Sequence, residues 1–247
     1  MQTFYLTDTG KVRDHNEDSV IILNNENEEY LLAVADGMGG HKAGEVASAI
    51  VINHLTEEFY SLDSIGDKEH AIEFLRNIVT EMNNKIFDYT KENPDSKGMG
   101  TTFVCAIQTK DYLLYGNIGD SSGFVIKKGK LTKVTKDHTL VNLLVSTGEL
   151  TPEEAKYHPR KNVLMRALGA NNPIEIDIFD VESNVDGILL CSDGLTNMLT
   201  EEQIEKVLSE DKSVEEVVKK LINKANARGG NDNISVAYLK KNEGRDV

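Results

Sequence analysis

Ten short apolar runs alternate with two pairs of amphipathic segments, and this order constrains the fold more than any other feature of the chain. The runs are rich in β-branched and aromatic residues and end at turn residues, which is typical of strands. They cover residues 3–8, 18–24, 30–35, 101–109, 112–118, 122–127, 131–135, 174–180, 186–191 and 233–239. Helical periodicity covers residues 43–60, 70–92, 201–209 and 214–227.

Short connections between consecutive runs indicate antiparallel pairing. Gly129 stands between two runs and predicts a tight hairpin there. Two helix pairs that flank two sets of strands predict an α+β fold, a four-layer α-β-β-α sandwich of two antiparallel sheets flanked by helix pairs. We expect one domain over residues 1–240 and a frayed tail over residues 241–247. The polar, interrupted segment 138–172 is expected to cross over one end of the sandwich.

Composition narrows the class of protein. The chain has 247 residues and a formal net charge of -14, which argues against an electrostatic grip on nucleic acid or an anionic membrane. No apolar stretch is long enough to span a bilayer, and the N-terminus lacks a signal peptide pattern. Cys105 and Cys191 lie inside apolar runs, which favours buried thiols in a reducing compartment. We therefore expect a cytoplasmic protein, and without a heptad repeat we expect a monomer.

Four aspartates, each beside or near glycine, stand at the ends of strand-like runs: Asp36, Asp120, Asp193 and Asp232. Glycine allows a sharp turn, and the neighbouring strand fixes the direction of the carboxylate. A single Asp-Gly pair is most often a β-turn, but four such corners predict a cluster. Clustered carboxylates repel one another unless a cation joins them. Carboxylates and the Gly37 carbonyl, without a Cys-His cluster, indicate magnesium or manganese.

Arg13 lies a few residues before two further acids, Glu17 and Asp18. A guanidinium can hold two phosphate oxygens at once, although a solvated charged loop is an equally good interpretation of this segment. No segment supplies the Gly-x-x-x-x-Gly-Lys-Ser/Thr pattern of a phosphate-binding loop. The acidic or apolar surroundings of both cysteines argue against a thiolate nucleophile. Hydrolysis by water that two cations activate is the remaining economical phosphoryl chemistry.

Seven motifs follow one another in a recognisable order. They are Arg13, Asn16-Glu17-Asp18, Ala35 to His41, Gly98-Met99-Gly100-Thr101-Thr102, Gly116 to Ser121, Ser192-Asp193-Gly194 and Gly230-Asn231-Asp232-Asn233. Together they resemble the metal-dependent serine/threonine protein phosphatases, the phosphatase 2C family, from about residue 4 to residue 239. The Gly-Gly-His ending of the third motif, Asp137-His138 and His158-Pro159-Arg160 resemble the bacterial branch.

The resemblance implies a ligand set for two core ions of Mn²⁺ or Mg²⁺ and a third, weaker site. The implied metal ligands are Glu17, Asp18, Asp36, Gly37, Asp120, Asp193 and Asp232. In this assignment Asp36 bridges the two core ions, and Gly37 contributes its carbonyl. Glu17 belongs to the second ion, Asp193 and Asp232 belong to the first, and Asp18 holds water.

The resemblance also assigns the third site and the contacts with substrate. Asp120, together with Asp193, matches the third metal site of bacterial members. Arg13 matches the residue that clamps the substrate phosphate, and residues 138–172 match a flap that affects substrate choice.

Two positions depart from the family pattern. Met38 stands where many eukaryotic members have a histidine that is thought to protonate the leaving alkoxide. His41 is a nearby candidate for this general acid, and a structural hydrogen bond is an equally good interpretation of it. Ser122 stands where the family often has arginine.

The expected function is hydrolysis of phosphoserine and phosphothreonine in proteins, with a cognate bacterial serine/threonine kinase of the eukaryotic-like type among the partners. Two alternatives stay open. One is a non-catalytic module that recognises a partner or senses metal on the same fold. The other is a metal-dependent nuclease or small phosphomonoesterase, of which the nuclease is disfavoured by the acidic net charge.

Overall fold

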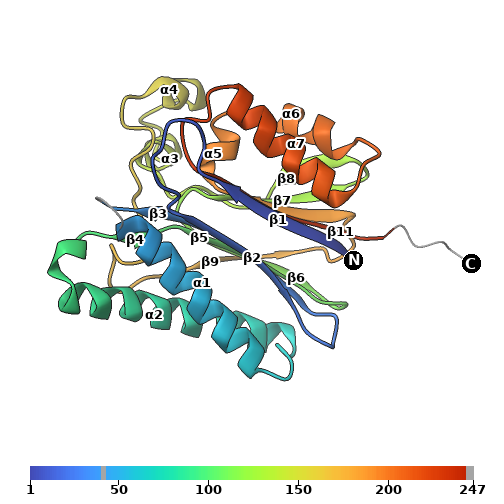
Figure 1. Ribbon diagram of the computed structural model, residues 1–247, viewed down its shortest axis with the longest axis horizontal. Coiled ribbons are helices and arrows are strands. Elements are labelled where there is room, and N and C mark those ends of the chain that lie inside the picture. The colour runs from blue at the N-terminus through green and yellow to red at the C-terminus, as the bar shows by residue number, and fades with distance from the viewer. Residues whose placement is uncertain (40–42, 243–247) are drawn as a thin grey trace, which may run out of the picture.

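Two antiparallel β-sheets lie face to face, and helices cover the outer face of each sheet (Figure 1). The computed structural model describes residues 1–39 and 43–242. The first sheet has the order β1 (Gln2–Asp8), β11 (Ile234–Lys240), β10 (Gly187–Cys191), β7 (Ser122–Lys127) and β8 (Lys130–Lys133). The second has the order β2 (Asp18–Asn24), β3 (Tyr30–Met38), β5 (Phe103–Gln108), β6 (Leu113–Ile118) and β9 (Asp177–Val181), and the short β4 (Gly100–Thr101) pairs with β3.

One pair of long helices covers each sheet. The pair α1 (Ala43–Ser61) and α2 (Lys68–Glu92) packs on the second sheet, and the pair α6 (Glu201–Leu208) and α7 (Val214–Ala227) packs on the first. Side-chain caps set their starts: Asp67 accepts a hydrogen bond from the His70 N–H at α2, and Ser213 forms a capping box with Glu216 at α7. The predicted four-layer sandwich and its helix pairs are confirmed.

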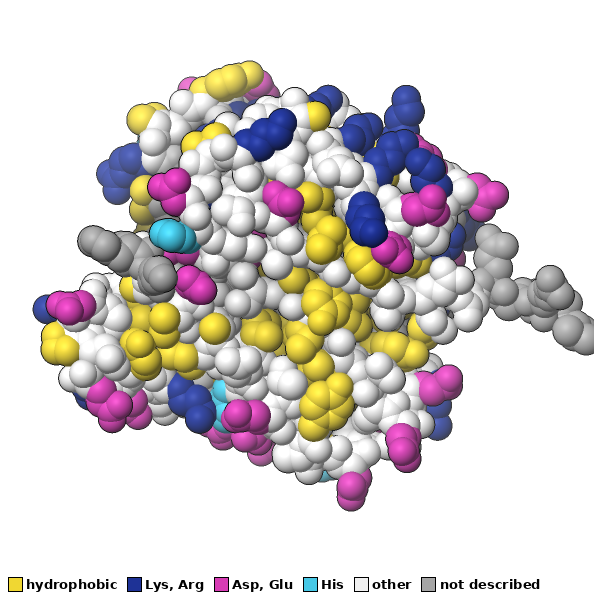
Figure 2. All heavy atoms as spheres, in the orientation of Figure 1, with side chains coloured by type: hydrophobic (Ala, Val, Ile, Leu, Met, Phe, Trp, Pro, Cys, Tyr) yellow, Lys and Arg dark blue, Asp and Glu magenta, His cyan; other side chains and the backbone are white. Residues whose placement is uncertain are grey.

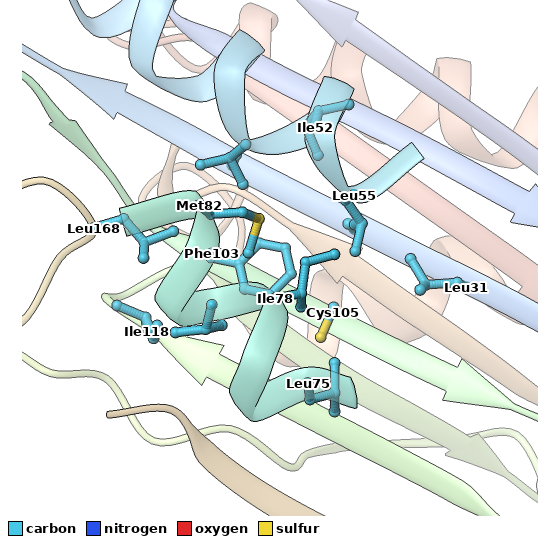
Figure 3. Packing of buried hydrophobic residues seen from close by; sticks show 14 of the residues in the cluster. Leu31, Ile52, Leu55, Leu75, Ile78, Met82, Phe103, Cys105, Ile118 and Leu168 are labelled. Atoms are coloured by element: carbon cyan, nitrogen blue, oxygen red, sulfur yellow. The ribbon is translucent and has the colours of Figure 1, made fainter. Parts of the chain in front are cut away.

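Three apolar cores hold the four layers together. In the core under α1 and α2, Met82 and Ile78 pack over Phe103 of β5 (Figure 3). A second core joins the first sheet to α6 and α7, and a third lies between the sheets, where Val34 of β3 and Leu190 of β10 are fully buried. Each such side chain stabilises the fold by about 1.5–3 kcal/mol. On the face in Figure 2, hydrophobic side chains gather between the contacting edge strands β1 and β2.

The hairpin predicted at Gly129 is confirmed. β7 pairs with β8 in a register that places Lys127 opposite Lys130, which leaves a two-residue turn. Both turn residues have positive φ, 53° for Lys128 and 74° for Gly129. A turn of this kind matches the right-handed twist of paired strands.

Most strand boundaries differ from the predicted ones by one to three residues, and two of the differences have a clear physical cause. The run 101–109 is divided at Thr102, because the Asp36 N–H of β3 donates to the Thr102 side-chain oxygen at 3.0 Å, so the side chain takes the place of a backbone acceptor in the ladder. The run 174–180 begins as a strand only at Asp177, because Ile174 and Ile176 pack against the core under α1 and α2. Packing therefore overrides the local β-propensity of these residues.

Residues 138–172 lie at one end of the sandwich, near the end of β3 and the short helix α5 (Asp193–Thr196), as Figure 1 shows. They contain two short helices, α3 (Leu140–Ser146) and α4 (Pro152–Tyr157). α4 begins at a capping box between Thr151 and Glu154. Backbone hydrogen bonds between Thr101 and Leu168 tie the end of this segment to β4. The remaining short helices are η1 (Pro94–Ser96) and α5 (Asp193–Thr196).

Candidate active site

The four predicted aspartates meet at one end of the sandwich. Asp36 lies on β3, Asp120 follows β6, Asp193 begins α5 directly after β10, and Asp232 precedes β11. All four line one cavity of about 590 Å³, which we call the acid-lined cavity. Because the strands of both sheets end here, residues far apart in the sequence come together.

Three other predicted residues, Arg13, Glu17 and Gly37, line the same cavity. Asp18 is buried and lies opposite Asp36 in the register of β2 and β3. His41 lies outside the described residues.

Buried hydroxyl groups fix the backbone of Asp36. Its N–H donates to Thr102 Oγ1 at 3.0 Å, and its carbonyl accepts from Thr101 Oγ1 at 2.9 Å. Thr102 Oγ1 is also 2.8 Å from Ser121 Oγ, which lies next to Asp120. These contacts lock two of the acids to one buried network, so the direction of each carboxylate is set by neighbouring strands.

Glycine is required at two of the acid corners by close approach of the backbone. A Cβ on Gly194 would lie 2.0 Å from the Asn233 carbonyl oxygen. A Cβ on Gly37 would lie 2.2 Å from the Gly44 carbonyl oxygen and 2.5 Å from that of Glu17. The glycines therefore let separate chain segments pack closely enough to share one cavity.

Asn233 joins the N-terminal loop to the start of β11. Its Oδ1 accepts a hydrogen bond from the Glu17 N–H at 2.8 Å. Its Nδ2 donates to the carbonyl oxygens of Thr9 and His15, both at 2.9 Å. The side chain is buried, and all its hydrogen bonds reach across the fold. Asn233 thus positions the loop that carries Arg13 and Glu17.

Burial and mutual repulsion raise the pKa values of several of these acids. Burial raises the pKa of Asp18 to about 7, that of Asp120 to about 7 and that of Asp193 to about 6. Burial, and then the charges of Asp18 and Asp193, raise the pKa of Asp36 well above its ordinary value. Burial also raises the pKa of Glu17. The protein alone therefore does not neutralise these carboxylates, and a cation would.

Unpartnered carboxylate oxygens fit a hard cation. Ser192 Oγ donates to Asp18 Oδ2 at 2.7 Å, but Asp18 Oδ1 is buried and has no hydrogen-bond partner within residues 1–39 and 43–242. The same holds for Glu17 Oε1 and Asp193 Oδ1. A buried acceptor that lacks a donor costs about 1–3 kcal/mol, and a divalent ion would remove this cost. The all-oxygen donor set suits Mg²⁺ or Mn²⁺.

The acids line one cavity, but among the described residues no three of them bring ligand atoms within 4.8 Å of one another. Within residues 1–39 and 43–242, the one group of three candidate ligands with atoms all within 4.8 Å of one another is His54, Glu58 and Glu81, on α1 and α2. There His54 Nε2 lies 3.0 Å from Glu81 Oε2, which is a histidine–carboxylate pair between two helices. The wider spacing in the acid-lined cavity suits ions that keep part of their water shell.

Arg13 reaches the cavity from the N-terminal loop. Its Nη2 donates to Asp232 Oδ2 at 2.7 Å, and its side chain is 49% exposed. One carboxylate therefore orients the guanidinium, whose other N–H groups can face a ligand in the cavity. This geometry suits the binding of an oxyanion beside the acids.

Other lining residues were not predicted from the sequence. Part of the lining comes from the segment 138–172 and includes Asn162, Met165, Arg166 and Asn171. Nothing in the local sequence of these residues distinguishes them from other surface positions. Thr102 is an exception, because it belongs to the motif Gly98-Met99-Gly100-Thr101-Thr102, which could have indicated that it lies beside the acids.

A sandwich of this topology with an acid-lined cavity and an adjoining arginine defines a metal-dependent phosphatase. The chain belongs to the protein phosphatase 2C family, whose model it matches over residues 10–237. The expected resemblance is confirmed. Among the described residues, no helix is both long and apolar enough to cross a bilayer.

Similar proteins span the whole chain. The serine/threonine phosphatase stp of Listeria welshimeri is 41% identical over 100% of both chains, and the protein phosphatase PhpP of Streptococcus pneumoniae is 35% identical over 98% of both. Among solved structures, a bacterial serine phosphatase superposes with a TM-score of 0.91 at 37% identity over 100% of both chains. Staphylococcus aureus Stp1, a serine/threonine phosphatase, superposes with a TM-score of 0.91 at 36% identity, over 98% of this chain and 95% of the other.

Proposed function

We propose that this protein hydrolyses phosphoserine and phosphothreonine in other proteins, with two divalent cations, Mn²⁺ or Mg²⁺, in the acid-lined cavity and a third beside Asp120. The observation that carries the proposal is the gathering of five acids and Arg13 around one cavity, with buried carboxylate oxygens that lack partners among the described residues. Family membership and relatives named as serine/threonine phosphatases support the same reaction.

The ligands in this proposal are Glu17, Asp18, Asp36, Gly37, Asp120, Asp193 and Asp232. When bound, the cations lower the pKa of a water toward neutrality and stabilise the charge that develops on the phosphoryl group. Asp36 of β3 lies within electrostatic reach of four of the other acids, Asp18, Asp120, Asp193 and Asp232. Asp18 has one oxygen bound by Ser192 and the other without a partner in the described part of the chain, so it could accept a hydrogen bond from the attacking water.

Arg13 binds the substrate phosphate and holds it in line for attack. Its guanidinium keeps its position through Asp232, so little side-chain entropy is lost when phosphate arrives. The leaving alkoxide needs a proton, and Met38, which lines the cavity, has none to give. We assign His41 as the candidate donor on its sequence position alone.

The proposed substrates are phosphoproteins, including those made by a serine/threonine kinase of the same cell. Loss of the phosphatase should raise the level of phosphothreonine on shared targets, and an unchanged phosphoproteome would count against this pairing. We further propose a single catalytic domain over residues 1–240 that works as a cytoplasmic monomer. Cys105 and Cys191 are both buried and free, which suits a reducing compartment.

Phosphate release from a phosphothreonine peptide tests the reaction. The native protein is assayed with Mn²⁺ and with a chelator, and the Asp193→Asn variant is assayed with Mn²⁺. We expect turnover by the native protein with Mn²⁺. The rate should fall by at least about a hundredfold with the chelator, which removes the cations, and in Asp193→Asn, which lacks a ligand to them. Equal release in all three samples would refute the mechanism.

A further inference from the structure

A second cavity of about 610 Å³ adjoins the acid-lined cavity, and we call it the Lys136 cavity. It lies between the segment that links β8 to α3, the helix α3 itself, and Asp177 of β9. Met165 and Arg166 line both cavities. A peptide whose phosphorylated residue enters the acid-lined cavity therefore has neighbouring residues within reach of the Lys136 cavity.

Hydrogen bonds hold one wall of the Lys136 cavity in place. Arg166 Nη1 donates to Asp177 Oδ1 at 2.6 Å, and His138 Nε2 lies 3.1 Å from Asp177 Oδ2. The other ring nitrogen, His138 Nδ1, accepts from the Gly119 N–H at 3.1 Å, which favours a neutral ring with its proton on Nε2. Burial also lowers the pKa of His138. The wall is thus preformed and is joined to the loop of Asp120.

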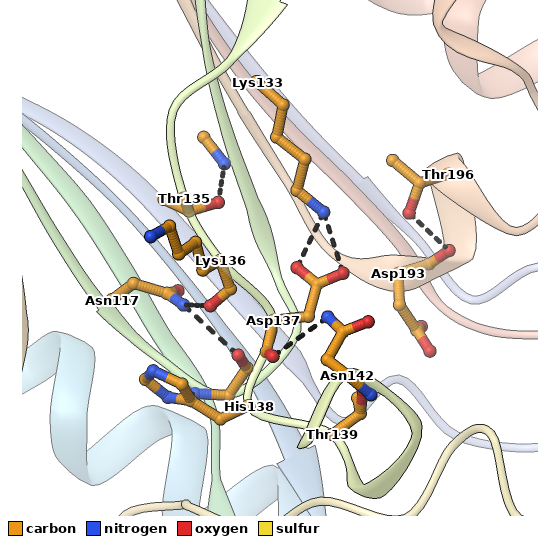
Figure 4. Close-up of polar contacts among 12 residues, drawn as sticks. Asn117, Lys133, Thr135, Lys136, Asp137, His138, Thr139, Asn142, Asp193 and Thr196 are labelled. Atoms are coloured by element: carbon orange, nitrogen blue, oxygen red, sulfur yellow. Dashed lines mark hydrogen bonds and ion pairs between the residues drawn. The ribbon is translucent and has the colours of Figure 1, made fainter. Parts of the chain in front are cut away.

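Ion pairs account for two of the three Lys and Arg side chains that line the cavity, Lys133 and Arg166. The Lys133 ammonium lies 2.7 and 2.9 Å from the two carboxylate oxygens of Asp137, and Asp177 is paired with Arg166. Lys136 is exposed, and in the described chain no carboxylate lies within 4.0 Å of its ammonium. Figure 4 shows the Lys136 ammonium well apart from the Lys133–Asp137 pair. The cavity therefore carries a net positive charge on a protein whose net charge is -14.

The rest of the lining is apolar and partly open to solvent. Leu143 of α3 and Met165 are each 47% exposed, and Val145 also lines the cavity. An apolar wall next to a single ammonium suits a side chain that carries a hydrocarbon stem and an anionic end. Aspartate and glutamate have this form, and lysine and arginine would be repelled.

We propose that the Lys136 cavity binds a carboxylate side chain of the substrate, an aspartate or glutamate within a few residues of the phosphorylated residue, and that Lys136 sets this preference. The inference rests on the proposed function, because it concerns residues that flank the phosphate in a protein substrate. The acidic net charge disfavours acidic peptides in general, so a preference at one position would come from a local contact.

The test compares phosphothreonine peptides of one length that carry Glu, Ala or Lys at single positions from the fourth residue before the phosphate to the fourth after it. The proteins are the native chain, Lys136→Met, Lys136→Glu and Lys130→Glu. Lys130 is an exposed lysine at the β7–β8 turn, so its substitution gives the same change in net charge away from both cavities. Melting temperatures check folding, and turnover of para-nitrophenyl phosphate, which has no flanking residues, reports on the active site separately.

We expect the native chain to prefer Glu over Ala at one or two positions by about two- to fivefold in kcat/KM, as for an exposed ion pair. Lys136→Met should abolish the preference, Lys136→Glu should reverse it toward Lys, and Lys130→Glu should retain it. The same ratio of Glu to Lys peptides in the native chain and in Lys136→Glu would overturn the subsite while leaving the reaction intact. Turnover of para-nitrophenyl phosphate without turnover of any phosphopeptide would overturn the proposed function, and the subsite with it.

Discussion

Replacing Asp18 by asparagine isolates the free-energy cost of burying one carboxylate in the metal-free protein. Burial raises the pKa of Asp18 from an ordinary value of 3.8 to about 7. That difference corresponds to about 4 kcal/mol in the free energy of unfolding. The side chain is 7% exposed, so solvent screens little of this cost.

The sign of the effect follows from which state binds the proton. Between pH 4 and pH 7 the unfolded chain has an ionised Asp18, while the folded protein keeps the proton. The folded state therefore loses stability as pH rises through this window, by about 1.4 kcal/mol per pH unit, and the loss is complete above about pH 7. Asparagine is neutral throughout, so the variant should gain stability relative to the native protein over the same window.

Urea unfolding in the presence of a chelator measures this difference at several values between pH 4.5 and pH 8. Circular dichroism is the suitable signal, because the chain has no tryptophan. Asparagine can still accept the hydrogen bond from Ser192, and any cost of its buried amide is constant with pH. The quantity to compare is therefore the change with pH in the difference between the unfolding free energies of Asp18→Asn and the native protein.

Asp95→Asn, at an exposed position, is the control for loss of one negative charge. A difference between Asp18→Asn and the native protein that does not change with pH would refute this reasoning. With Mn²⁺ in place of the chelator, the relative gain of Asp18→Asn should shrink, because a bound cation favours the ionised carboxylate.

Three further substitutions test how the site is held. Arg13→Ala should weaken inhibition by inorganic phosphate by on the order of tenfold or more, and an unchanged inhibition constant would remove Arg13 from the phosphate site. Gly194→Ala should lower the free energy of unfolding by about 2 kcal/mol or more and weaken Mn²⁺ binding, because its Cβ would lie 2.0 Å from the Asn233 carbonyl oxygen. Melting and Mn²⁺ titration curves like those of the native protein would contradict this close contact. Asn233→Ala should cost about 1–3 kcal/mol in urea unfolding and raise KM, since it releases the loop of Arg13, and a loss of stability without any change in KM would limit Asn233 to a structural role.

The layers of the fold could be predicted because their signals are local. The periodicity of α2 and the turn at Gly129 each depend on residues a few positions apart, and both have the expected form. Strand ends are harder to predict, since the break at Thr102 comes from a hydrogen bond that its side chain accepts from the Asp36 N–H on another strand. Ile174 and Ile176 have strand propensity, but their side chains fill the core under α1 and α2.

The acids of the site could be predicted from the sequence because they lie at or near the ends of buried strands, and strand ends meet at one end of a sandwich. The side chains that hold these acids in place could not be predicted. Ser192 donates to Asp18 across two sheets, and His138 bonds both the Asp120 loop and Asp177. Such contacts depend on how the sheets stack, which no short pattern encodes. The net charge of the Lys136 cavity likewise depends on which lysine lies close to a carboxylate in the folded protein.

The central claim is that the clustered carboxylates bind divalent cations which drive the hydrolysis. Anomalous diffraction at the manganese edge, from a crystal soaked in Mn²⁺, tests it most directly. We predict at least two anomalous peaks in the acid-lined cavity, in contact with oxygens of Asp36, Asp193 and Asp232, and their loss in the Asp36→Asn protein. An empty cavity in crystals of a protein that remains active under the same conditions, or manganese only at the His54 pair, would contradict it.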